Sequence, residues 1–282
     1  MVHADRETAA LSRLSRRSVV AALGAVAAGA VIGVQRAGAA TPATAAATGL
    51  DDPAKKEIAM KLVSSAENSS LDWKAQYKYI EDIGDGRGYT AGIIGFCSGT
   101  GDMLTLVQHY NALKPNNILS KYLGALKSVN GSASHSGLDP NFTKDWATAA
   151  ADPAFQQAQV DELDSAYFNP AVSQAKADGL RTLGQFIYYD AMVMHGPGSD
   201  SQSFGGIRAA ALRKAKPPSQ GGDEITYLNA FLDARKAAMK ADPSHQDTSR
   251  VDTEQRLFVK AGNLDLNTPL HWSVYGDSYM IN

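Results

Sequence analysis

The sequence contains a single cysteine, Cys97, among its 282 residues. One cysteine cannot form an intramolecular disulfide, so no covalent cross-link stabilises the chain. The length and the 44% content of apolar residues suffice for one domain with a substantial core, in one or two lobes. Cys97 lies in an apolar run with no base beside it, which favours a buried, inert thiol over a nucleophile.

A strong excess of charge is also missing. The chain has 27 basic and 29 acidic residues; outside residues 1–39, 22 basic and 27 acidic residues remain, a formal charge of −5. A mildly acidic protein is a poor partner for nucleic acid and is compatible with a cationic one. The sequence also lacks a metal-binding pattern: His135 lies in a Gly/Ser-rich loop, and no second ligand accompanies it at the spacing of a metal site. We therefore expect neither a metal nor a cofactor.

The apolar run over residues 21–34 is too short to cross a membrane comfortably. It follows the twin-arginine pair Arg16-Arg17 and precedes a small-residue cleavage site at 37–39. A single-pass anchor is the less favoured alternative. We predict a secreted protein, not attached to a membrane once processed, in three segments: a twin-arginine signal peptide over 1–40, a flexible leader remnant over 41–49 and a mature domain over 50–282.

The first strong helix signal ends at an acidic residue. Asp51 and Asp52 are good capping residues, and Pro53 suits the first helical position. Apolar residues recur at helical spacing as far as Ala66. Glu67 therefore falls on or near the apolar face at the C-terminal end of the helix, where burial and the helix dipole both disfavour its ionised form. A carboxyl group that holds a proton near neutral pH suits a general acid.

A second acidic residue, Asp85, lies in a tight turn between two strand signals. Residues 77–82 alternate in polarity, and residues 89–97 form an apolar run interrupted by glycine. Between two glycines and close to Arg87, Asp85 should be solvated and ionised. A protonated Glu67 and an ionised Asp85 match the division of labour in a glycoside hydrolase. An Asp-Gly loop is also often only a turn.

The two carboxyl groups lie within a longer pattern of motifs. The sequence resembles the glycoside hydrolase family 46 chitosanases, in particular the secreted streptomycete enzymes, over residues 50–282. The resemblance is carried by five stretches: Ala66–Ser70, Tyr79–Thr90, Gly95–Asp102, His195–Gly198 and Thr248–Gln255. The residue pattern by itself predicts a mainly helical α+β fold with a small antiparallel sheet after the first helix. The resemblance implies a lysozyme-like arrangement of two lobes, with the sheet in one lobe and the substrate groove between them.

The resemblance also implies an activity. The expected protein is a monomeric endo-acting enzyme that cleaves β-1,4 bonds between glucosamine units of chitosan with inversion, using Glu67 as general acid and Asp85 as general base. Thr90 would help to hold the attacking water. Two alternatives stay open: a lysozyme-like muramidase, and a catalytically silent chitosan-binding protein. Four further residues would line the sugar groove: Asn68, Arg87, Asp102 and His245.

Each of these groove residues also has a plain structural explanation. Asn68 would serve local turn chemistry, and Arg87 would be a solvated cation. Asp102 opens a predicted helix, where a carboxylate stabilises the dipole. His245 would be an exposed loop histidine.

Asp190 lies on an apolar stripe of a long predicted helix that begins at Asn169-Pro170 and ends before Gly196. A buried carboxylate needs cationic partners, or it takes up a proton. The resemblance implies Arg235 and Arg250 as those partners, in a charged network behind the active site. The alternative is a solvated Asp190. Elsewhere we predict an irregular tail after residue 264 and three tryptophans that anchor the core instead of stacking on sugars: Trp73, Trp146 and Trp272.

Overall fold

The computed structural model describes residues 49–242 and 245–282. The predicted signal peptide and the leader remnant up to residue 48 lie outside the described residues. In the described part of the chain, no helix is both long enough and apolar enough to cross a membrane.

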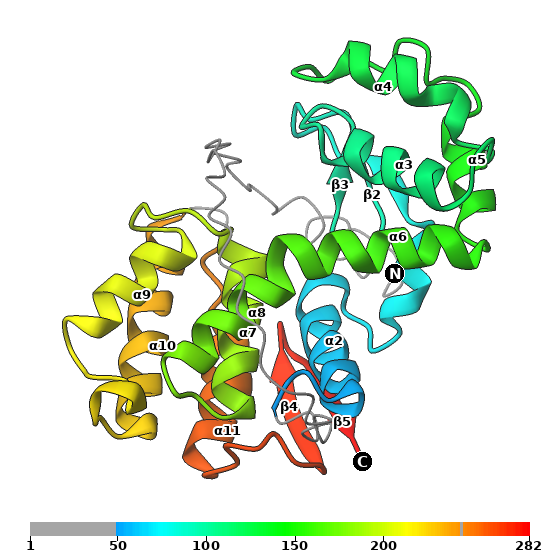
Figure 1. Cartoon of the computed structure of the whole chain (residues 1–282). Coiled ribbons are helices and arrows are strands. Elements are labelled where there is room, and N and C mark those ends of the chain that lie inside the picture. The colour runs from blue at the N-terminus through cyan, green and yellow to red at the C-terminus, as the bar shows by residue number, and fades with distance from the viewer. Residues whose placement is uncertain (1–48, 243–244) are drawn as a thin grey trace, which may run out of the picture.

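Two lobes lie on either side of the helix α6, which runs between them (Figure 1). The smaller lobe holds a short sheet and the helices that follow it: β1 (Ile80–Asp82), β2 (Tyr89–Ala91), β3 (Phe96–Cys97), α3 (Asp102–Leu113), η2 (Ser120–Tyr122), α4 (Leu123–Val129) and α5 (Phe142–Ala149). The predicted mainly helical α+β class with a small antiparallel sheet in one lobe is confirmed.

The larger lobe is built from helices and a C-terminal hairpin (Figure 1). Its first helix, α2, is followed by the short 3₁₀ segment η1. After the smaller lobe, the chain returns through α6 and the π-helix η3 to the remaining helices and the hairpin of the larger lobe. The elements are α2 (Pro53–Asn68), η1 (Trp73–Lys78), α6 (Pro153–Leu163), η3 (Asp164–Phe168), α7 (Asn169–Ala177), α8 (Thr182–His195), α9 (Phe204–Leu212), η4 (Pro218–Gln220), α10 (Glu224–Ala241), η5 (Arg250–Gln255), α11 (Arg256–Lys260), β4 (Leu270–Val274) and β5 (Asp277–Ile281).

The long helix predicted from Asn169 to the residue before Gly196 is wrong in its continuity, because two helices, α7 and α8, occupy this range. Helical structure also enters α7 directly from α6 through the π-helical turns of η3, which end at Phe168. The break comes later, at Gly179, which has a φ of +79°. The amides of Gly179 and Leu180 bond the carbonyls of Lys176 and Ala175, a Schellman motif that ends α7.

The small sheet has the order β1-β2-β3 and is antiparallel throughout. Glu81 pairs with Thr90, and Thr90 pairs with Cys97. The expected return strand over 89–97 is split by a turn that uses Gly92 and Gly95, both at positive φ. The strand expected from Tyr77 starts only at Ile80, because the preceding residues belong to η1.

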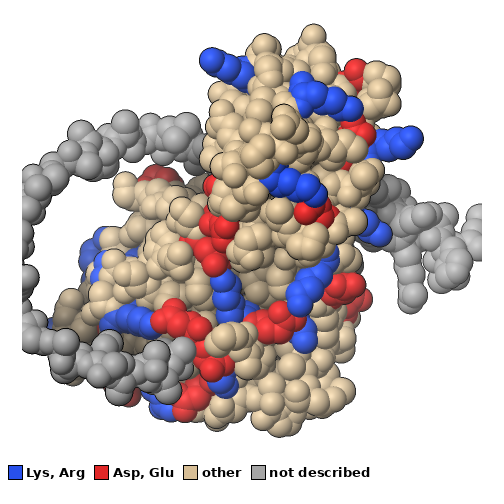
Figure 2. Space-filling model, turned by 45° about the vertical axis from the view of Figure 1, so that its right-hand side comes forward, with Lys and Arg blue, Asp and Glu red and all other residues tan. Residues whose placement is uncertain are grey.

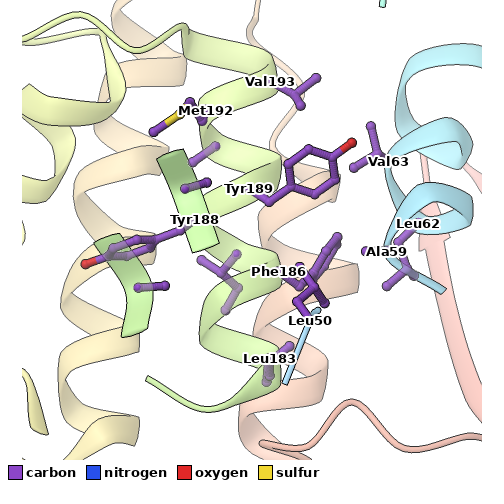
Figure 3. Packing of buried hydrophobic residues seen from close by; sticks show 14 of the residues in the cluster. Leu50, Ala59, Leu62, Val63, Leu183, Phe186, Tyr188, Tyr189, Met192 and Val193 are labelled. Atoms are coloured by element: carbon purple, nitrogen blue, oxygen red, sulfur yellow. The ribbon is translucent and has the colours of Figure 1, made fainter. Parts of the chain in front are cut away.

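Each lobe has its own hydrophobic core, and α6 contributes to both. Phe155 and Ala158 lie in the core of the smaller lobe, and Leu163 lies in that of the larger lobe. Helix α8 is buried from Thr182 to Val193, as expected for a central helix with no solvent-facing side. Figure 3 shows its side chains packing toward those of α2 across the larger core.

The buried aromatic residues agree with the predictions. Trp146 is fully buried and donates to the carbonyl of Tyr77 at 3.1 Å; Trp272 is buried and donates to Ser65 Oγ at 3.0 Å. Trp73 is buried as well, so all three tryptophans are core residues. Cys97 is buried, as predicted.

The prediction of an irregular tail is wrong. Strands β4 and β5 pair from Leu270 with Ile281 to Val274 with Asp277. The two residues between them, Tyr275 and Gly276, both have positive φ. That is the geometry of a type I′ turn, whose twist matches that of a two-stranded hairpin.

Candidate functional site

Glu67 occupies the last turn of α2. The helix begins as predicted, with the Asp52 carboxylate accepting the amides of Ala54 and Lys55, and it ends at Ser69 in the left-handed conformation. The Glu67 side chain is only 11% exposed, and its Oε1 accepts a hydrogen bond from Arg250 Nη1 at 2.7 Å. Burial and the helix dipole favour the protonated carboxyl, whereas the arginine favours the carboxylate, so the two influences oppose each other.

Asp85 lies in the loop between β1 and β2. Its Oδ1 accepts the amide of Arg87 at 3.0 Å, and its Oδ2 accepts Arg87 Nε at 2.8 Å and Nη2 at 2.5 Å. Partial burial lowers the pKa of Arg87, but the hydrogen bond that it donates to Asp85 and the nearby negative charges together outweigh burial, and the net pKa is raised. Three donor atoms of Arg87 thus hold the Asp85 carboxyl group in one orientation.

Asp102 is the first residue of α3 and ties that helix to the sheet. Its Oδ1 accepts three hydrogen bonds, from the amides of Cys97 (3.0 Å) and Met103 (2.9 Å) and from the hydroxyl of Thr100 (2.6 Å). Within the described residues, no protein donor bonds its Oδ2. Desolvation by neighbouring atoms raises the pKa of Asp102 in spite of these bonds. Asp102 therefore anchors the helix with one oxygen and leaves the other available.

Thr90 sits on β2 between these groups. It is buried, and its Oγ1 lies 3.5 Å from Cys97 Sγ. Burial raises the pKa of the Cys97 thiol, as expected for an inert cysteine. Arg87 interacts electrostatically with both Asp85 and Asp102. The smaller lobe thus brings its predicted site residues together at one end of the sheet.

Asp190, Arg235 and Arg250 form a cluster inside the larger lobe. Asp190 and Arg235 are fully buried and Arg250 is 2% exposed, so a solvated Asp190 is excluded. Arg250 Nε donates to both Asp190 oxygens at 2.9 Å, and Arg235 Nη1 donates to Asp190 Oδ2 at 2.6 Å. Burial raises the pKa of Asp190, but the two guanidinium groups outweigh it and hold the pKa below its ordinary value. Arg250 bonds Asp190 and Glu67 at once and so links this cluster to the candidate acid.

Two residues of the cluster were not predicted. Gln255 donates to Asp190 Oδ2 at 2.6 Å and accepts from Arg235 Nη1 at 3.0 Å. Glu254 is fully buried, and neither of its carboxyl oxygens has a hydrogen-bond partner in the described structure. Both lie in η5, where π-helical winding places them on one face with Arg250. The spacing of three polar residues at 250, 254 and 255 is the signal that could have found them.

Asn68 and His245 are placed by local contacts. Asn68 Nδ2 donates to Ser64 Oγ at 3.3 Å, within the same helix. His245 lies 2.7 Å from Asp242 Oδ2, and its side chain is largely enclosed, so it is not a fully exposed loop residue. It lines a small pocket with His195, and burial together with Arg235 lowers the pKa of His195 to about 3.

The described residues hold no group of three or more His, Cys, Asp or Glu side chains that could bind a metal ion. His135 instead stacks on the ring of Tyr89 and lies 3.0 Å from Asp82 Oδ2. On the face shown in Figure 2, basic and acidic side chains are interspersed and do not form one continuous basic patch.

Comparisons with known proteins agree with one another. The model of glycosyl hydrolase family 46 matches residues 61–270. A chitosanase of Streptomyces sp. is 70% identical over 281 residues, which cover 100% of both chains. A chitosanase of Nocardioides sp. is 72% identical over 237 residues, covering 84% of this chain and 85% of the relative.

Solved structures give the same picture. A chitosanase complex superposes with a TM-score of 0.78 at 60% identity, covering 84% of this chain and 100% of the other. The family 46 chitosanase of Gynuella sunshinyii, solved in complex with chitotetraose, gives a TM-score of 0.72 at 34% identity, covering 81% of this chain and 97% of the other.

Proposed function

The chain belongs to glycosyl hydrolase family 46, and we propose that it cleaves β-1,4 bonds within chitosan by an inverting mechanism. It is a chitosan-cleaving glycoside hydrolase with the lysozyme-like fold of its structural relatives. The observation that carries the mechanism is the contrast between two carboxyl groups. Glu67 lies on a helix of the larger lobe, where burial and the arginine Arg250 act in opposite directions on its protonation, and Asp85 lies in the β1–β2 loop of the smaller lobe, where Arg87 donates to its carboxyl oxygens.

In this proposal Glu67 is the general acid. It donates its proton to the glycosidic oxygen of the leaving sugar. A group with this task must hold a proton before the transfer and be stable as an anion after it. Burial and the C-terminal end of α2 favour the first state, and the bond from Arg250 favours the second. Each of the two protonation states that the acid must adopt is therefore favoured by part of its surroundings.

Asp85 is the general base. An inverting reaction needs a water on the face of the sugar opposite the acid, and the two carboxyl groups then stand roughly 6.5–9.5 Å apart in the substrate complex. Asp85 would take a proton from this water as it attacks the anomeric carbon, and Thr90 would help to hold the water. The hydrogen bonds from Arg87 restrict the rotation of the Asp85 carboxyl group, so the base is oriented before the substrate arrives.

The stereochemistry of the product tests this mechanism. We expect an NMR time course of chitosan digestion to show new reducing ends that appear first as the α anomer, because a β bond is cleaved with inversion. If the β anomer appears first, the reaction retains configuration and Asp85 is a nucleophile. Chitosan binding without new reducing ends would identify a silent binding protein, and clearing of peptidoglycan in place of chitosan would identify a muramidase.

We propose that a groove between the lobes binds the chitosan chain, with Asn68, Arg87, Asp102 and His245 along it. The glucosamine amines are largely protonated at mildly acidic pH, so carboxylates beyond the catalytic pair should attract them. Asp102 Oδ2, to which no described protein group donates a hydrogen bond, would be one such acceptor.

Asp102→Asn separates the binding role from the structural one. An amide oxygen can still accept the three hydrogen bonds that Oδ1 receives, so we expect the melting temperature to stay close to that of the wild type. A lost charge-assisted hydrogen bond is worth about 1.5–3 kcal/mol, and kcat/KM should fall about ten- to a hundredfold. The deficit should shrink at high salt, because screening weakens the wild-type attraction.

Asp102→Ala is the matched control, since it removes the helix anchor as well and should lower both stability and binding. Wild-type kinetics of Asp102→Asn at low salt would leave Asp102 with a structural role only.

We also propose that the protein is exported by the twin-arginine route and acts outside the cell as a monomer, with residues 50–282 as its catalytic domain. The support is the sequence of residues 1–40 and the single cysteine, which requires no oxidative folding after export. The cellular location of a precursor carrying Arg16→Lys and Arg17→Lys tests the route: normal secretion of that precursor would exclude it.

A further inference from the structure

Glu254 is a carboxyl group enclosed within the larger lobe. It has no exposed surface, and neither of its oxygens is hydrogen-bonded in the described residues. Burial and the nearby charge of Asp190 raise its pKa well above the ordinary value, although Arg250 and Arg235 act in the opposite direction. Buried polar groups without partners are rare, and each calls for an explanation. The mechanism above makes no use of this one.

The charges around Glu254 come from four elements. Arg250 precedes it in η5, Arg235 comes from α10, and Asp190 comes from α8. Glu67, at the end of α2, bonds Arg250 from the other side. Two further residues adjoin the arginines. His195 Nε2 accepts a hydrogen bond from Arg235 Nε at 3.4 Å, and the lowered pKa of His195 keeps this side chain neutral. Tyr275 interacts electrostatically with Arg250.

The charge balance of this cluster is incomplete without one more anion. Two guanidinium groups face the single carboxylate of Asp190, which leaves one unit of positive charge in a region shielded from water. Either Glu67 or Glu254 can neutralise it, but if both ionised the cluster would carry an excess negative charge. Two carboxyl groups that compete for one compensating charge titrate as a linked pair.

We propose that Glu254 is a positioning residue that shares one negative charge with Glu67 through Arg250 and Arg235. When Glu67 is ionised on Arg250, Glu254 is a neutral acid. When Glu67 takes up a proton from solvent, Glu254 releases its own proton to solvent and supplies the anion that the arginines require. No proton passes directly between the two groups, because the coupling is electrostatic.

The consequence for catalysis rests on the proposed role of Glu67 as the general acid. An ionisable Glu254 lets Glu67 remain protonated beside Arg250 up to a higher pH than it could alone. Glu254 thus sets the upper limit of the pH range in which Glu67 is protonated, although Glu254 does not contact the substrate.

The kinetic test is Glu254→Gln, a neutral isostere that cannot supply the anion. Glu67 must then carry the charge, so the basic limb of the kcat/KM profile should move to lower pH by about one unit. Rates above that limb should fall about tenfold, whereas rates below it should match the wild type. Glu254→Asp, which keeps an ionisable carboxyl group, should restore the limb. A uniform fall at every pH, or an unmoved limb, would overturn the proposal, since a purely packing role predicts those outcomes.

An infrared measurement tests the same coupling without activity. At neutral pH the wild type should show the carbonyl stretch of a buried protonated carboxylic acid, assigned to Glu254 by its loss in Glu254→Gln. In Glu67→Gln the competitor is gone, so Glu254 should ionise and this band should disappear. A band that persists in Glu67→Gln would refute charge sharing.

The kinetic and infrared tests distinguish a failure of Glu67 as the general acid from a failure of charge sharing by Glu254. If Glu67→Gln remains active, the assignment of the acid fails, while the infrared comparison still decides on Glu254. If Glu67→Gln is inactive and the limb of Glu254→Gln does not move, only the inference about Glu254 fails. Should Glu254→Gln not fold, a shift of the band in Glu254→Asp assigns it to Glu254, and the infrared comparison of the wild type with Glu67→Gln then decides.

Discussion

Glu67→Gln should fold like the wild type and lose about a hundred- to ten-thousandfold in kcat, the range that a positioned general acid contributes. The amide keeps the size of the side chain, and its oxygen can still accept the 2.7 Å hydrogen bond from Arg250 Nη1. It has no proton of suitable acidity for the leaving oxygen. Counting new reducing ends on chitosan at several pH values measures the loss, and a melting curve verifies the fold.

Two comparisons make this result specific to proton donation. Glu67→Asp keeps a titratable group but shortens the side chain, so we expect partial activity in place of an intact rate. The affinity of Glu67→Gln for chitosan oligomers should stay close to that of the wild type, because the loss concerns the transition state. A variant that keeps more than a tenth of the wild-type turnover would show that another group donates the proton.

Asp190→Ala should lower the free energy of unfolding by about 3–5 kcal/mol, the usual effect of removing one partner from a buried ion pair. Asp190 accepts hydrogen bonds from Arg235, Arg250 and Gln255 at distances of 2.5–2.9 Å. Without its carboxylate, two buried guanidinium groups face each other. Since about 1 kcal/mol shifts the melting temperature of a chain of this size by roughly 2–4 °C, the loss is readily measured by calorimetry.

The pH dependence of that loss has a definite sign. The two arginines lower the pKa of Asp190 in the folded state, so its stabilising contribution is present at neutral pH. This contribution is lost as the pH falls, first through the pKa that Asp190 has in the unfolded chain and then through its lower pKa in the folded protein. The difference between wild type and Asp190→Ala should therefore narrow in strong acid.

Asp265→Ala is a suitable control for Asp190→Ala, because Asp265 pairs with Arg181 in an exposed ion pair. Such pairs contribute at most about 1 kcal/mol, so the control should melt close to the wild type. Equal melting temperatures for Asp190→Ala and the wild type would mean that the buried network contributes nothing to stability.

Some features of the site follow from short stretches of sequence. Asp52 and Pro53 set the start of α2, and the helical repeat then places Glu67 at its buried C-terminal end. Gly84 and Gly86, both at positive φ, form the turn that presents Asp85, and Arg87 is close enough in sequence to pair with it. These features were predictable because capping, helical periodicity and turn geometry depend on neighbouring residues.

Local sequence signals mispredicted secondary structure where tertiary packing or an uncommon backbone geometry determines it. Asn169-Pro170 marks the start of α7 as predicted, but the π-helical turns of η3 join α7 to α6, and Gly179 divides the predicted long helix into α7 and α8. The hairpin β4–β5 depends on Tyr275 adopting a positive φ, which its residue type does not favour. In both places the surrounding structure stabilises a backbone geometry that the local sequence does not announce.

The sequence by itself determined the family, the two candidate carboxyl groups and the elements that carry them, since these depend on motifs and on local geometry. Only the tertiary structure decided which charges meet. Arg250 reaches Glu67 from 183 residues away, and Glu254 becomes a buried acid only because η5 packs among α8, α10 and β4. The protonation of a carboxyl group depends on the charges and the water around it, and those are assembled only when distant segments of the chain fold together.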